Sequence, residues 1–62
     1  MITIWNAVTG TKLCVSPGTA DEALDAYARD QGWDSWERWC AEGRAPEGEL
    51  ALIGDDGPAV FR

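Results

Sequence analysis

Most of the side chains in this 62-residue chain that could take part in acid–base chemistry are carboxylates. All eleven aspartates and glutamates fall between Asp21 and Asp56, where three arginines accompany them, so this stretch carries 3 − 11 = −8. The chain has two cysteines, Cys14 and Cys40, and no histidine. Paired carboxylates could act as general acid and base, but the imidazole that most often moves protons near neutral pH is missing. The composition therefore favours presenting charge to a partner over catalysis.

The candidate nucleophiles lack the groups that would activate them. Cys14 or Cys40 would need a neighbouring imidazole or cation to hold a thiolate, and a serine would lack a base for the same reason. Asp55 and Asp56 are adjacent, but residues 54–57 have the composition of a turn. So short a chain also has little material with which to enclose a cleft of several hundred Å³. We therefore expect no catalytic residue and no enzyme.

The spacing of the cysteines does not predict a metal site. They lie far apart in the chain, outside any C-x-x-C unit, and only carboxylates could complete a zinc site around them. We expect no metal and no cofactor, and we interpret Cys14 and Cys40 as two small, reduced, buried side chains. A functional disulfide, or a small redox protein that uses both thiols, is the alternative.

Two hairpins are expected, one at each end of the chain. Residues 2–8 alternate loosely and are rich in β-branched and aromatic side chains; a T-G-T turn and a second strand over residues 12–15 follow. Residues 49–53 and 59–61 predict the other two strands, with the turn 54–57 between them. Pro58 predicts an edge position for the last strand, because proline cannot donate to a ladder.

Two helices are expected between the hairpins. Thr19 and Glu22 form a capping box, and an apolar stripe at i, i+3, i+4, i+7 and i+8 follows it: Ala20, Ala23, Leu24, Tyr27 and Ala28. Gly32 ends this helix. Asp34 is the expected N-cap of a second, short helix, which Gly43 ends.

These elements predict a single small α+β domain over residues 1–62. Its antiparallel sheet, made of N- and C-terminal hairpins, is packed on one face by two short helices in the order ββααββ. Trp36 and Trp39 are expected on the helix face that covers the sheet, and Trp33 is expected to remain partly exposed.

The helical carboxylates are the candidate binding residues. Asp21, Glu22 and Asp25 span four residue steps, about 6 Å of helix axis, so one charge falls in about every 2 Å, close to the roughly 1.7 Å of duplex DNA. Asp30 lies on the flank of the same helix, and Glu37 and Glu42 extend the charge along the second. The alternative is a solvated face in which Asp25 pairs with Arg29 and the early acids favour the helix dipole.

Small size, acidity and a set of helical carboxylates resemble the acidic inhibitors that bacteriophages carry against host defences, in particular anti-CRISPR proteins of the DNA-mimic kind. The resemblance covers the whole chain through these properties, not through a shared motif. It implies a non-enzymatic inhibitor that docks onto the basic nucleic-acid-binding surface of a host protein or ribonucleoprotein complex and keeps target DNA out. The partner-binding residues it implies are Asp21, Glu22, Asp25, Asp30, Glu37 and Glu42.

The negative charge argues against direct binding to nucleic acid or to an anionic membrane. No run approaches the ~20 apolar residues of a membrane span, and the first residues do not resemble a secretory signal. We therefore expect a protein of the host bacterial cytoplasm, as a monomer in preference to a dimer. The alternative function is a small binding module or inhibitor that acts without DNA mimicry, through Trp5, Trp33 or the edge strand at residues 58–62.

Overall fold

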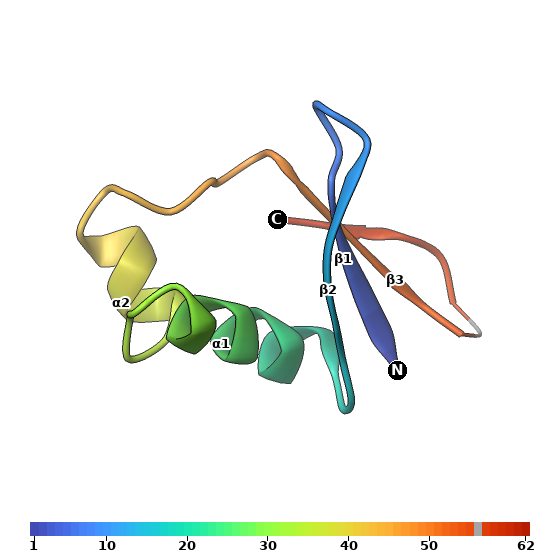
Figure 1. Ribbon diagram of the computed structural model, residues 1–62, viewed down its shortest axis with the longest axis horizontal. Coiled ribbons are helices and arrows are strands. Elements are labelled where there is room, and N and C mark those ends of the chain that lie inside the picture. The colour runs from blue at the N-terminus through green and yellow to red at the C-terminus, as the bar shows by residue number, and fades with distance from the viewer. Residues whose placement is uncertain (56) are drawn as a thin grey trace.

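The computed structural model describes residues 1–55 and 57–62 (Figure 1). Its elements, in chain order, are β1 (Ile2–Asn6), β2 (Thr11–Ser16), α1 (Ala20–Asp30), α2 (Trp36–Ala41), β3 (Leu50–Gly54) and β4 (Val60–Phe61). The strands form one antiparallel sheet in the order β2-β1-β3-β4. This confirms an α+β fold with both helices between the two hairpins. Asp56, which the sequence places in the turn after β3, lies outside the described residues.

The first hairpin turns earlier than its apolar pattern predicts. β1 ends at Asn6, not at Val8, because the Asn6 side chain accepts hydrogen bonds from the backbone N–H groups of Val8 (2.9 Å) and Thr9 (3.0 Å). Such a side-chain turn competes with the strand for the backbone. Gly10, at a φ of +74°, completes the turn in a region that favours glycine.

At the other side of the sheet, β4 is an edge strand, as Pro58 predicts. It comprises only Val60 and Phe61, and the backbone of Arg62 continues the pairing through two hydrogen bonds with Leu50 (3.0 and 3.1 Å). This leaves β1 and β3 as the central strands of the sheet.

The capping box at the start of α1 is present as predicted. The Thr19 hydroxyl accepts from the Glu22 backbone N–H (3.3 Å), and the Glu22 carboxylate accepts from the Thr19 N–H (3.0 Å). Gly18 allows this arrangement, because it has a φ of +93° and a Cβ there would lie 2.9 Å from the Glu22 carboxylate. The apolar stripe of α1 then packs onto the sheet, and the resulting core consists of Ile4, Ala23, Leu24, Leu50 and Leu52.

The second helix departs from the prediction in its cap and its position. Its N-cap is Ser35, not Asp34, since the Ser35 hydroxyl accepts from the Arg38 N–H (3.0 Å). α2 packs mainly against α1, and Figure 1 shows it farther from the strands than α1. Trp36 reaches the core cluster, but Trp39 is buried among aromatic rings. Its ring lies 5.6 Å from that of Tyr27, 6.1 Å from Trp33 and 5.7 Å from Trp36, centroid to centroid. α1 therefore covers the sheet as expected. The expectation that Trp39 covers it too is wrong, because its ring packs among the aromatic rings of the two helices.

Candidate functional site

Three of the predicted binding residues converge on one groove between the two helices. Asp21, Asp25 and Glu37 line a hollow of about 230 Å³ together with Leu24 and Trp36. Asp21 and Asp25 lie about 40° apart around α1, at 3.6 residues per turn, and Glu37 comes from the first turn of α2. Among the described residues that line this groove there is no lysine or arginine. We call Asp21, Asp25 and Glu37 the acidic groove.

Asp25 has a structural duty that sequence spacing did not reveal. One of its carboxylate oxygens accepts a hydrogen bond from the backbone N–H of Trp36 at 2.9 Å. That N–H belongs to the first residue of α2, where no intrahelical partner exists. Asp25 therefore caps the second helix from the first. The Asp25–Arg29 pair of the alternative interpretation is not found, since the ion pairs of residues 1–55 and 57–62 are Met1–Asp55 and Arg38–Glu42.

The other three predicted residues lie apart from the groove. Glu22 is engaged in the capping box. Glu42 pairs with Arg38 at 3.3 Å. Asp30 is about 140° beyond Asp25 around α1, beside Cys14 and Tyr27, with which it lines a different recess. The six carboxylates therefore do not share one face.

Both thiols are free, and both are half-buried and not fully buried as the sequence suggests. Burial raises the pKa of Cys40 to about 11, with a hydrogen bond to Glu47 and its negative charge as the lesser causes. Burial, followed by the charge of Asp30, also raises the pKa of Cys14. A thiol with a raised pKa is a weak nucleophile at neutral pH, because the thiolate is the reactive form.

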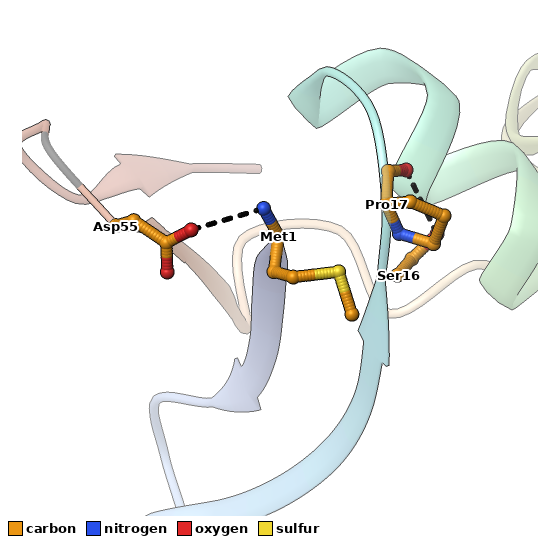
Figure 2. Close-up of polar contacts among 4 residues, drawn as sticks. All are labelled: Met1, Ser16, Pro17 and Asp55. Atoms are coloured by element: carbon orange, nitrogen blue, oxygen red, sulfur yellow. Dashed lines mark hydrogen bonds and ion pairs between the residues drawn. The ribbon is translucent and has the colours of Figure 1, made fainter.

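The N-terminus of the chain lies beside the second hairpin. Figure 2 shows the Met1 ammonium against the carboxylate of Asp55, at 3.2 Å. Asp55, which the sequence assigns to a turn, therefore pairs with the terminal ammonium charge. The same view shows the buried Ser16, whose hydroxyl donates to the backbone oxygen of Pro17 at 3.3 Å.

The remaining geometric tests concern metals and membranes. No group of three histidine, cysteine, aspartate or glutamate side chains is arranged to hold a metal ion, as far as the described residues extend. In the same part of the chain, neither helix has the length and apolar character that crossing a membrane requires.

The sequence prediction missed the apolar floor of the groove and the link between its two helices. Leu24 and Trp36 were assigned to the core, and their contribution to the groove depends on the angle between α1 and α2. Spacing could reveal that Asp21 and Asp25 share a helix face. It could not reveal that Glu37 joins them, because that requires the turn between the helices. The chain matches no protein-family model, and no curated protein or solved structure matches it either.

Proposed function

We propose that this chain is a non-enzymatic inhibitor that binds the basic nucleic-acid-binding surface of a host RNA-guided surveillance complex, as a DNA mimic of the anti-CRISPR kind. The observation that carries the proposal is the convergence of Asp21, Asp25 and Glu37 on one groove without a lining cation. Carboxylates placed this way substitute for phosphates opposite lysine and arginine. The site of action would be the host bacterial cytoplasm.

The arrangement suits a binding surface because the two helices that carry its charges are linked before the partner arrives. Asp21 and Asp25 project from α1, and the hydrogen bond from Trp36 to Asp25 fixes the second helix, which carries Glu37. A preorganised surface loses less conformational freedom on binding. The formal charge of −6 would attract a cationic partner from a distance, so association should be fast and weaken with salt.

The test neutralises the groove without disturbing the fold. The variant Asp21→Asn, Asp25→Asn, Glu37→Gln changes the formal charge from −6 to −3, and asparagine at position 25 keeps an oxygen for the Trp36 N–H. A matched control, Asp34→Asn, Glu47→Gln, Glu49→Gln, makes the same charge change at exposed positions outside the groove. Each variant is expressed in bacteria that carry a CRISPR system of known type, and phage plating efficiency is measured.

We expect the original chain and the control variant to restore phage plating in at least one CRISPR type, and the groove variant to lose at least tenfold of that effect. Purified surveillance complex of that type should lose target-DNA binding in the presence of the chain. If the groove variant protects phage as well as the original chain does, the acidic groove is not part of the contact with the partner. Failure to protect phage in any type would overturn the inhibitor itself.

A second candidate function follows from Trp33. This residue lies in the turn between the helices, is only half-buried, and stacks on Trp39 with an angle of 18° between the ring planes. A rigid, partly exposed aromatic side chain is typical of binding hot spots. It favours an inhibitor or binding module that makes an aromatic contact in place of charge mimicry.

Substitution of Trp33 by alanine separates the two candidates. Loss of partner binding with retained fold and unchanged salt dependence would favour the aromatic contact. Retained binding with Trp33→Ala, together with loss in the groove variant, would favour the acidic groove.

A further inference from the structure

The sheet has a second face that the described helices do not cover. Strand register and alternation place seven residues on it: Thr3, Trp5, Lys12, Val15, Ala51, Ile53 and Phe61. None of them belongs to the core cluster or to the residues packed against it, although Ala51, between larger neighbours, is only 7% exposed. Phe61 is 67% exposed, Val15 47% and Ile53 43%, and Trp5 is half-buried. We call these seven residues the outer sheet face.

The outer sheet face is apolar and almost free of charge. Lys12 is its one charged side chain among the described strand positions, whereas the acidic groove and its neighbours lie on the helices. On a chain of formal charge −6, this is the place where a second negative protein can approach with least repulsion. Contiguous exposed apolar surface of this kind is typical of an interaction site.

The face is also complementary to itself. One row across the sheet reads Lys12, Trp5, Ala51, Phe61, and a two-fold axis along the strands between β1 and β3 reverses that order. Trp5 of one copy then lies over Ala51 of the other, a large side chain against a small one. Lys12 lies over the ring of Phe61, a cation–π arrangement. Contacts repeated on both copies in this way characterise a two-fold dimer interface.

We infer that two copies of this chain associate face to face through the outer sheet face, as a weak dimer with the acidic grooves on its outer sides. β1, β2 and β3, about 4.8 Å apart and about five residues long, with the two-residue β4 beside them, give a face of roughly 280 Å². Two such faces bury on the order of 600 Å², below the roughly 1,200 Å² at which stable interfaces begin, so the association is weak. The dimer therefore forms only at high protein concentration and is compatible with a monomer in dilute solution.

This inference is independent of the proposed function, and salt separates the two. Binding of a cationic partner weakens as salt rises. Self-association of a chain with charge −6 strengthens as salt rises, because screening reduces the repulsion between like-charged copies. Dimer formation is measured on the purified chain alone, without any partner.

Sedimentation equilibrium from about 10 μM to about 1 mM, at low and high salt, tests the inference. We expect the weight-average mass to rise from 6.7 kDa toward twice that value, and to rise further at high salt. Phe61→Glu and Ile53→Glu should each weaken association at least tenfold. Val8→Glu is the matched control, since Val8 is 72% exposed in the β1–β2 turn and lies off the face. Circular dichroism verifies that each variant folds.

Three results would overturn the inference. One is a monomer at every concentration and salt. Another is that the variants Phe61→Glu and Ile53→Glu dimerise as strongly as the control variant Val8→Glu. The third is a set of concentration-dependent NMR shifts that map to the acidic groove or to the free edge of β2, and not to Trp5, Ile53 and Phe61.

Discussion

Asp25 combines two roles that ordinary charge mutagenesis would confuse. It contributes a negative charge to the acidic groove and an acceptor to the first N–H of α2. Asp25→Ala removes both, and we expect it to lower the free energy of unfolding by about 1–3 kcal/mol, the range for a lost hydrogen bond to a charged group or a lost cap. Asp25→Asn should cost less than about 1 kcal/mol, because the amide oxygen replaces the carboxylate as acceptor. Urea denaturation measures both variants, and equal losses would mean that the hydrogen bond does not hold α2.

Cys40 gives a test of the thiol environment. Its pKa lies near 11 against an ordinary value of 9.0, so at pH 8 the folded chain holds about a hundredfold less thiolate there than the unfolded chain. In a Cys14→Ser background, we expect dithionitrobenzoate to react correspondingly more slowly with the native chain than with the urea-unfolded one. The fold favours the protonated thiol, so the stability from this group is complete below pH 9 and is lost as pH rises toward 11. Equal reaction rates in both states would contradict the raised pKa of this half-buried thiol.

At the scale of elements, the aromatic cluster is what attaches α2. Trp39 is buried and contacts the rings of Tyr27, Trp33 and Trp36. Trp39→Ala should therefore cost about 3–5 kcal/mol, a large share of the stability of so small a domain. Trp33→Ala, at the margin of the cluster, should cost clearly less. Thermal unfolding and near-ultraviolet circular dichroism measure this difference, and similar losses would show that the cluster has no buried centre.

The elements that the sequence predicted best are those that depend on residues close together in the chain. α1 follows from a capping box and an apolar stripe within a dozen residues, and the edge position of β4 follows from Pro58. The cap of α2 was misassigned because Asp34 and Ser35 are both good N-cap residues and only the backbone decides between them. The packing of α2 was misassigned because a tryptophan stripe shows that a face is buried but not which element buries it. For the same reason, the sequence could not predict that Trp36 and Glu37 of α2 join the groove.

At the scale of the whole molecule, charge and apolar surface are separated. Carboxylates converge between the helices, while the outer sheet face carries a single lysine among its described positions. A surface that concentrates like charge is usually less stable than a mixed one, since repulsion is released on unfolding. Binding surfaces often carry such a cost. Repulsion among the carboxylates of the acidic groove should therefore lower the free energy of unfolding of the free protein.

Thermal unfolding at low salt tests this separation without any partner. The groove variant Asp21→Asn, Asp25→Asn, Glu37→Gln removes three carboxylates that converge, whereas the control Asp34→Asn, Glu47→Gln, Glu49→Gln removes three outside the groove. We expect the released repulsion to exceed the cost of Asp25→Asn, which is below about 1 kcal/mol. The groove variant should then gain more stability than the control, with a rise in Tm of a few degrees, since about 1 kcal/mol shifts Tm by roughly 4–8 °C in a domain of this size. The difference should shrink in about 0.5 M salt, where the screening length falls to a few ångströms. Equal shifts in both variants at low salt would mean that the three carboxylates do not interact, and the groove would then have no special field to offer a cationic partner.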